Sequence, residues 1–244
     1  GPLFCETGKC HGIKTLALQN AALSFLSLPT MIFAHKFAVA SQKQLNGLIR
    51  LGADPEQIAV TGHPLYDPYL KERRDPKPIR ESLDIKPEQK FLLLTTQHTR
   101  HEENIEFIEA ALAAVASMRN VKTIIKLHPR EQPAEYGALA DQIEAQNHCA
   151  EIVHHRDVVE LISAADLMIS RFSTTIQSAL MIGTPVVAYV SSSYRDYDTD
   201  YLASPAVIKA TDLEMFKKTI LEHLSENQAL YNEFMKNRAQ YLEQ

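Results

Sequence analysis

The sequence predicts an α/β protein with a doubly wound parallel sheet, preceded by a partial or reduced amino-terminal α/β domain. Two observations lead to this fold class. From Ile13 to Val190, short apolar runs rich in β-branched residues alternate with longer segments of helical periodicity, which is the pattern of βαβ units. Polar clusters follow several of these runs, where open parallel sheets bind their ligands.

The apolar runs and the periodic segments define the expected elements in order. The expected strands are Ile13–Leu18, Met31–Phe33, Ile58–Thr61, Phe91–Thr95, Val121–Lys126, Leu167–Ile169 and Val186–Val190. The expected helices are Ser41–Leu51, Ile105–Met118, Pro133–Gln146, Val158–Ala164, Thr174–Ile182, Leu213–Leu224 and Gln228–Leu242. Gly52 and Gly183 each follow a helix, where glycine adopts the left-handed conformation at low cost.

A charged stretch with several prolines, residues 71–90, is predicted to be a linker. It separates a partial amino-terminal domain (1–70) from a complete domain (91–225), which a carboxy-terminal helix (226–244) follows. Residues 1–70 hold few strands for an independent α/β domain, so they are either the tail of a larger domain or a strongly reduced one.

Composition narrows the function classes. A net charge of −5 argues against general nucleic-acid binding, which usually requires a basic excess. The sequence has neither an apolar run of membrane-spanning length nor a signal-peptide pattern, so we expect a cytoplasmic protein. Cys5, Cys10 and Cys149 lack the spacing of a zinc site, and we expect reduced thiols and no metal.

Three hydroxyl residues, Ser173, Thr174 and Thr175, follow the strand Leu167–Ile169 and open the next helix. One hydroxyl is enough to cap a helix, and that is the structural interpretation. The functional interpretation is that the other hydroxyls and the free N–H groups bind a phosphate at the positive end of the helix. Arg171 either adds a planar fork for phosphate oxygens or is an ordinary surface arginine.

A second polar cluster ends the strand Val121–Lys126 and contains Lys126, His128 and Arg130. Pro129 keeps His128 away from helical geometry, so the imidazole is held at an extended turn. One ring nitrogen can then donate to a phosphate while the backbone fixes the other. The alternative is a turn with a loosely packed imidazole, but the neighbouring cations favour a phosphate site.

The loop after Phe91–Thr95 is dense in polar groups and opens on the same rim of the sheet. Thr96 is a candidate phosphate ligand, and His98 or His101 is a candidate acid or base near neutral pH. Glu102 or Glu103 can pair with a histidine. The alternative is a helix start in which Thr99 caps and the glutamates complement the dipole.

Two further loops offer weaker candidates. His63 and Asp67 follow the strand Ile58–Thr61 near the predicted domain junction, as cleft residues or as part of a hinge turn. Asp196, Asp198 and Asp200 alternate in one loop and can hold a sugar or a divalent cation, although solvated loop acids are commoner.

The order of these motifs resembles the GT-B glycosyltransferase superfamily, which includes the UDP-N-acetylglucosamine 2-epimerases. The resemblance rests on GIKTLALQ, then LIRLGADPEQIAVTGHPLYD, FLLLTTQH and IIKLHP, and finally AADLMISRFSTTIQSALMIGTPVVAY. His128-Pro129 after Lys126, and Ser173-Thr174 one βα unit later, are similar to the segments of bacterial CMP-sugar (sialic acid, Kdo) and CDP-glycerol transferases. The 2-epimerases instead carry Ser-Gly-Gly at the second position.

The resemblance implies a glycosyltransferase that uses a CMP- or CDP-linked donor in surface polysaccharide (capsule) synthesis, without a cofactor. Its implied partners are a nucleotide sugar and a glycan or lipid-linked acceptor, with peripheral association at the inner face of the cell membrane. The implied phosphate ligands include Lys126, His128, Ser173 and Thr174, and catalysis is assigned to His98, His63 and Asp67. The alternatives are an epimerase or hydrolase of UDP-N-acetylglucosamine and a non-catalytic binding module.

Overall fold

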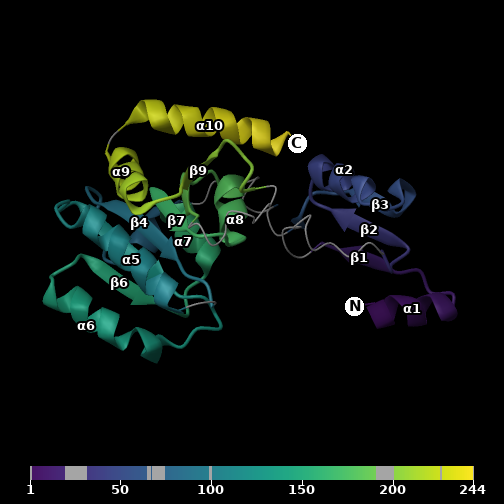
Figure 1. The fold of residues 1–244 in the computed structure, drawn as a ribbon, viewed down its shortest axis with the longest axis horizontal. Coiled ribbons are helices and arrows are strands. Elements are labelled where there is room, and N and C mark those ends of the chain that lie inside the picture. Colours follow the sequence, from purple (N-terminus) through teal and green to yellow (C-terminus); the bar gives the residue numbers. More distant parts are fainter. Residues whose placement is uncertain are drawn as a thin grey trace.

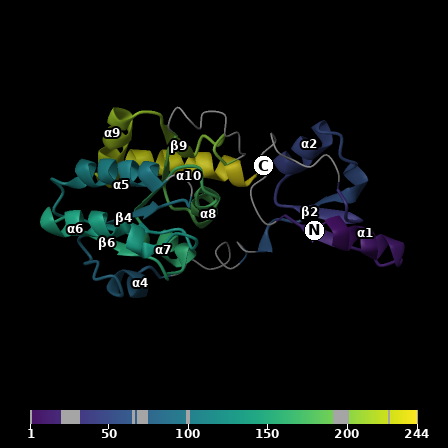
Figure 2. The ribbon, with the colours of Figure 1, turned by 60° about the horizontal axis from the view of Figure 1, so that its bottom comes forward.

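The computed structural model describes residues 2–19, 32–64, 67, 75–98, 101–190, 201–225 and 227–243 (Figure 1). The described residues form two parallel sheets, each with its own helices. In both views the carboxy-terminal end of the chain lies on the side that faces the smaller, amino-terminal sheet (Figures 1 and 2). The residues that end helix α10 can therefore contribute to a site between the two sheets.

The first sheet has three strands in the order β1 (Leu16–Leu18), β2 (Lys36–Val39) and β3 (Ile58–Val60), all parallel. Helix α1 (Pro2–Cys10) precedes β1, and helix α2 (Gln42–Arg50) with the 3-10 turn η1 (Pro55–Gln57) connects β2 to β3. Val39, Leu48 and Ile58 form its small core, so α2 covers one face of the sheet.

The second sheet has six parallel strands in the order β6-β5-β4-β7-β8-β9. The strands are β4 (Lys90–Thr95), β5 (Val121–Lys126), β6 (Ala150–Val153), β7 (Leu167–Ser170), β8 (Val186–Tyr189) and β9 (Val207–Ala210). The chain moves outward from β4 to β6, then returns to the other side of β4 and moves outward again from β7 to β9. Strand order therefore reverses between β4 and β7, and this is the doubly wound arrangement expected from the sequence.

Alternate side chains of the six strands enter two apolar clusters, one on each face of the sheet. Helices α5 (His101–Val115), α6 (Gly137–Ala145) and α9 (Leu213–Leu224) cover the face that contains Leu92 and Leu94. Helices α4 (Lys77–Glu81), α7 (Val158–Ala164), α8 (Thr175–Ile182) and α10 (Gln228–Leu242) cover the face that contains Phe91 and Leu93. The result is a three-layer α/β/α domain, and the predicted fold class is confirmed.

Helix α4 lies inside the range 71–90, which the sequence predicts to be a linker. Its Ile79 packs against the second core, and Arg80 donates to the carbonyl of Ala164 (3.1 Å) and to Asp166 Oδ2 (3.1 Å). Asp166 Oδ2 also accepts from the N–H of Phe91 at 2.6 Å. The part of this range from residue 75 onward is therefore attached to the second sheet.

Several short elements differ from the sequence prediction. A strand was expected at Met31–Phe33, but Ile32 and Phe33 are not in a strand. The strand of this region is β2, which begins at Lys36. The strands β6 and β9 and the helix α1 are additional to the prediction. None of the helices in the described part of the chain is both long and apolar enough to cross a membrane.

Helix α8 ends with two stabilising features. Gly183 follows it with φ of 97°, and Arg238 of α10 donates to the carbonyls of Leu180 (2.5 Å) and Met181 (2.6 Å) in its last turn. A cation at this end also complements the negative pole of the helix dipole. Helix α8 is thus fixed at its carboxyl end by a residue from a distant part of the chain.

Replacing Gly183 with alanine is expected to lower the free energy of unfolding by about 1–2 kcal/mol, because the left-handed conformation is strained for any residue with a Cβ. A Cβ there would also lie 3.4 Å from Arg238 Cζ. Gly137→Ala is the matched control, because Gly137 has φ of −57° and a Cβ added to it would meet no atom within 4 Å. Urea unfolding of both variants tests this, and equal losses of stability would contradict it.

Candidate functional site

The polar residues that the sequence singles out in the larger domain gather at the switch point of the sheet. Strands β5, β4 and β7 are neighbours, with Thr95 paired to Lys126 and Leu94 paired to Ile169 in the parallel register. Because parallel strands end at the same edge, the segments after Thr95, Lys126 and Ser170 open on one rim. In open α/β sheets this rim is where ligands bind.

The start of α8 uses its three hydroxyl residues in three different ways. Ser173 Oγ accepts from the N–H of Thr175 (3.2 Å), so Ser173 acts as the cap. Thr175 Oγ1 lies 3.1 Å from Thr95 Oγ1 and 3.4 Å from Ser170 Oγ, which ties the helix to β4 and β7. Thr174 is exposed and its side chain makes no capping hydrogen bond. Thr174 is therefore the exposed residue of the three, and its contact with a phosphate stays a prediction.

Arg171, a predicted phosphate ligand, is only 2% exposed. Its guanidinium forms an ion pair with Glu103 in the first turn of α5, and its Cζ lies 5.4 Å from the centre of the Phe172 ring. The pair joins β7 to α5 across the switch point. The structure thus gives Arg171 a structural partner, and its contact with phosphate stays a prediction.

His128 is held by hydrogen bonds on both its backbone and its ring. Its N–H donates to Thr96 Oγ1 (3.0 Å) and to Glu131 Oε2 (2.7 Å). Its ring Nδ1 accepts from the N–H of Arg130 at 3.1 Å. Nδ1 is an acceptor in this contact, so in the neutral ring the proton sits on Nε2. Nε2–H is then the atom that His128 can present to an anion.

The ring of His98 stacks on that of His128, with centroids 4.8 Å apart and an angle of 28° between the rings. Burial lowers the pKa of His128, and the charges of His98, Arg130 and Lys126 lower it further, while Glu131 raises it. The net pKa lies below the ordinary histidine value, so His128 is mainly neutral at pH 7 and donates as an imidazole.

The carboxylate of Glu131 is the centre of this network, and the sequence analysis missed it. Glu131 is 6% exposed and accepts from four groups: Thr96 Oγ1, the N–H of His128 (2.7 Å), Asn104 Nδ2 (2.8 Å) and Tyr136 Oη (2.6 Å). Burial and the hydrogen bond to Glu131 raise the pKa of Tyr136 strongly. A glutamate three residues after the N–H that it accepts repeats the spacing of a capping box, and this signal could have found it.

The other residues of the β5 end are placed differently. Lys126 is 4% exposed, and its Nζ donates to the carbonyl of Leu127 (2.6 Å). Burial lowers the pKa of Lys126, although the charges of Asp157 and Glu131 raise it. Pro129 is exposed beside His128. Contact of Lys126 and Pro129 with a phosphate stays a prediction.

The remaining candidates have other surroundings or lie outside the described residues. His63 is half-buried and Asp67 is exposed, and both follow β3, the last strand of the amino-terminal sheet. The ring of His101 packs edge-on against Tyr136 at 4.7 Å. Thr99, Asp196, Asp198 and Asp200 lie outside the described residues. Within the ranges that the structure describes, no group of three or more His, Cys, Asp or Glu side chains could hold a metal ion.

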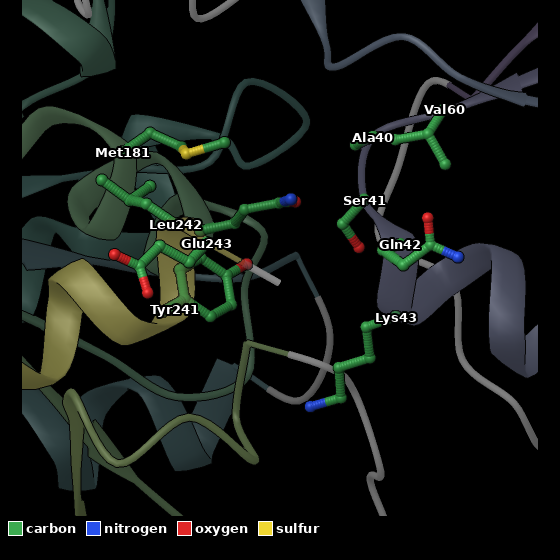
Figure 3. A pocket seen from close by; sticks show the side chains of 10 residues that line it. Ala40, Ser41, Gln42, Lys43, Val60, Met181, Tyr241, Leu242 and Glu243 are labelled. Carbon is green, nitrogen blue, oxygen red and sulfur yellow. The ribbon is translucent and has the colours of Figure 1, made fainter.

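A cavity of about 240 Å³ lies between the two sheets (Figure 3). The start of α2 contributes Ser41, Gln42 and Lys43, and the remaining lining comes from Ala40, Val60, Gln177, Met181, Tyr241, Leu242 and Glu243. Gln177 is 6% exposed and lies in the first turn of α8, two residues after Thr175. Amides, a hydroxyl, an ammonium, a carboxylate and one aromatic ring suit a polar, uncharged ligand that both donates and accepts hydrogen bonds.

Comparisons with known proteins agree with this fold. The family model for UDP-N-acetylglucosamine 2-epimerase matches residues 30–242. No sequence among curated proteins matches the chain.

Three solved structures illustrate the structural likeness. The wall teichoic acid polymerase TagF superposes with a TM-score of 0.65 at 12% identity, over 94% of this chain and 62% of TagF. A glycosyltransferase from Rickettsia africae superposes with a TM-score of 0.60 at 12% identity, over 98% of this chain and 74% of that protein. HepE from Anabaena, solved with UDP and glucose, superposes with a TM-score of 0.57 at 15% identity, over 98% of this chain and 69% of HepE. The chain therefore has a GT-B-like fold and spans roughly two thirds of the length of these proteins.

Proposed function

The chain belongs to the UDP-N-acetylglucosamine 2-epimerase family, and we propose that it binds a nucleotide-activated sugar at the carboxyl ends of β4, β5 and β7 and transfers the sugar to an acceptor. One observation carries this proposal. Thr95 is the last residue of β4 and Thr96 follows it; Thr95 contacts Thr175 at the start of α8, and Thr96 Oγ1 accepts from the backbone N–H of His128. The start of α8 and the backbone of His128 are therefore anchored to adjacent residues at the carboxyl end of β4.

These groups suit a leaving phosphate. When the bond between the anomeric carbon and the phosphate oxygen breaks, negative charge develops on the phosphate. Nε2–H of His128 and the hydroxyl of Thr174 are hydrogen-bond donors that can stabilise this charge, and the positive pole of the α8 dipole favours it. His98, stacked on His128, is our candidate for the base that takes the proton of the acceptor hydroxyl.

We propose a cytidine-linked donor and a role in surface polysaccharide synthesis, with a glycan or lipid-linked acceptor. The support is the order of Lys126, His128 and Pro129 after β5 and of Ser173 and Thr174 after β7. The cavity between the sheets is our candidate for the sugar ring, because Gln177 in its wall lies in the first turn of α8.

Calorimetric titration with CMP, CDP and UDP tests the nucleotide site directly. We expect CMP or CDP to bind more tightly than UDP, and His128→Ala to weaken whichever nucleotide binds. Strict preference for UDP would rule out the cytidine-linked donor but leave the site intact. Failure of all three nucleotides to bind the wild-type protein would overturn the proposed function.

The second candidate is a UDP-N-acetylglucosamine 2-epimerase or hydrolase, which the family match over residues 30–242 favours. NMR of UDP-N-acetylglucosamine incubated with the protein distinguishes the two reactions. Inversion at C2 or release of UDP without an acceptor supports the second candidate. Turnover that requires an added acceptor supports glycosyl transfer.

Gln177→Leu is expected to weaken binding of the sugar and not of the nucleotide. Loss of a buried amide that hydrogen-bonds the sugar should reduce affinity for UDP-N-acetylglucosamine or CMP-sialic acid about tenfold, with affinity for UDP or CMP unchanged. The matched control is Gln228→Leu, because Gln228 is exposed at the start of α10. Equal weakening of sugar nucleotide and free nucleotide would contradict a sugar site in this cavity.

A further inference from the structure

We propose that Glu131 is the positioning residue of this site, acting through His128: its buried carboxylate holds the loop after β5 against the loop after β4 and so aims Nε2–H of His128 at the ligand. This inference rests on the proposed function for its ligand, but the link between Glu131 and His128 can be tested in the ligand-free protein.

The contacts of Glu131 come from separate parts of the domain. Oε2 accepts from the N–H of His128 (2.7 Å) in its own loop and from Thr96 Oγ1 in the loop after β4. Oε1 accepts from Asn104 Nδ2 (2.8 Å) on α5 and from Tyr136 Oη (2.6 Å) in the 3-10 turn η3 (Pro133–Tyr136). One carboxylate thus joins four segments around the position of His128: the loops after β5 and β4, helix α5 and the turn η3.

A carboxylate is the group that these contacts require. All four donors are neutral, so the charge of Glu131 at 6% exposure is stabilised by hydrogen bonds. Glutamine has the same shape but replaces one acceptor oxygen with an NH₂ group. In one orientation its NH₂ would face the backbone N–H of His128, which cannot become an acceptor. In the other it would face Asn104, whose amide could accept only by flipping and losing its two hydrogen bonds with the backbone of Gln97.

The geometry of the His128 ring depends on this loop. With its N–H held by Glu131 and Thr96, His128 places Nδ1 3.1 Å from the N–H of Arg130 and stacks its ring on His98. Releasing the loop removes the contact that fixes Nδ1 as an acceptor. The ring would then sample both neutral tautomers, and Nε2–H would no longer be presented in one direction.

NMR of the ligand-free protein tests the link. The ¹⁵N shifts of the His128 ring report which nitrogen carries the proton. We expect the wild type and Glu135→Gln to show one tautomer, with the proton on Nε2, and Glu131→Gln to show a mixture. Glu135 is the matched control because it is exposed and lies four residues further along. An unchanged His128 tautomer in a folded Glu131→Gln variant overturns the proposal.

A double-mutant cycle with CDP and UDP as probes separates positioning from a general structural role. We expect Glu131→Gln to weaken the bound nucleotide about tenfold. In a background that already carries His128→Ala, the same change should have no further effect, because Glu131 acts through His128. Additive losses overturn the proposal. If the wild type binds neither of these probes nor CMP, the proposed function fails, and the NMR comparison alone decides the role of Glu131.

Tyr136→Phe provides a milder variant if Glu131→Gln does not fold. It removes one of the four donors and leaves the charge of Glu131 in place. We expect a smaller shift of the His128 tautomer in the same direction and a twofold to threefold loss of nucleotide affinity. A folded Tyr136→Phe variant with wild-type ring shifts and affinity counts against the proposal.

Discussion

Replacing His128 with alanine is expected to lower the turnover of the nucleotide sugar by about 100- to 1,000-fold, the usual effect of removing one donor aimed at developing charge. His128 is only half-buried, and its ring packs on His98 rather than in the core, so the variant should fold normally. The measurement is nucleotide released per unit time under saturating donor. His155→Ala is the control, because His155 is exposed beyond β6.

The pH dependence of nucleotide binding provides an independent check on His128. Because burial and the neighbouring cations lower its pKa, the imidazole becomes positively charged only below the ordinary histidine range. Affinity for CDP or UDP should therefore rise as the pH falls through that lowered pKa, because the imidazolium attracts the phosphate. The rise should disappear in His128→Ala. A variant with full turnover and an unchanged pH profile would exclude His128 from the site.

Replacing Arg171 with methionine is expected to lower the free energy of unfolding by about 3–5 kcal/mol, because removing one partner of a buried ion pair leaves the other charge poorly compensated. Arg171 is 2% exposed and pairs with Glu103, whose side chain is 24% exposed. A loss of this size is a large share of the stability of an ordinary domain, about 5–15 kcal/mol. Guanidinium unfolding measures it.

Two further variants show whether the ion pair is the cause. Arg171→Met combined with Glu103→Leu should recover part of the lost stability, because an apolar pair of similar size carries no unpaired charge. Lys218→Met is the control: the Lys218–Glu222 pair is 77% and 49% exposed and should contribute less than about 1 kcal/mol. If Arg171→Met keeps wild-type stability but loses nucleotide binding, Arg171 is a phosphate ligand instead of a structural residue.

Long periodic segments were predictable from the sequence, and short ones were not. The helices Val158–Ala164, Leu213–Leu224 and Gln228–Leu242 and the strand Val121–Lys126 have the bounds that the periodicity predicts. Each carries enough apolar positions to fix its period. The strand β2, KFAV, begins with a lysine and is too short to show a period. The more apolar run Met31–Phe33 therefore gave the stronger strand signal.

The sequence also pointed to some residues of the candidate site and not to others. Groups at strand ends, such as His128 and Thr174, were recognisable because the strands before them are strongly apolar. Glu131, Asn104 and Tyr136 were not, because their roles depend on contacts between segments far apart in the sequence. Arg171 shows the reverse: its place at a strand end suggested a ligand contact, and only the fold shows that Glu103 is near enough to take its charge.

The contact between Arg238 and the last carbonyls of α8 has a consequence for how the protein is made. Arg238 follows Leu180 by 58 residues, so a ribosome that has released α8 must still synthesise β8, β9, α9 and most of α10 before that partner exists. During this interval α8 already has its contacts with Thr95 and Ser170 and the packing of Leu180 in the second core, but the carbonyls of Leu180 and Met181 lack their side-chain donor. The carboxyl end of the helix whose start we assign to the phosphate is therefore completed only when synthesis of α10 has reached Arg238.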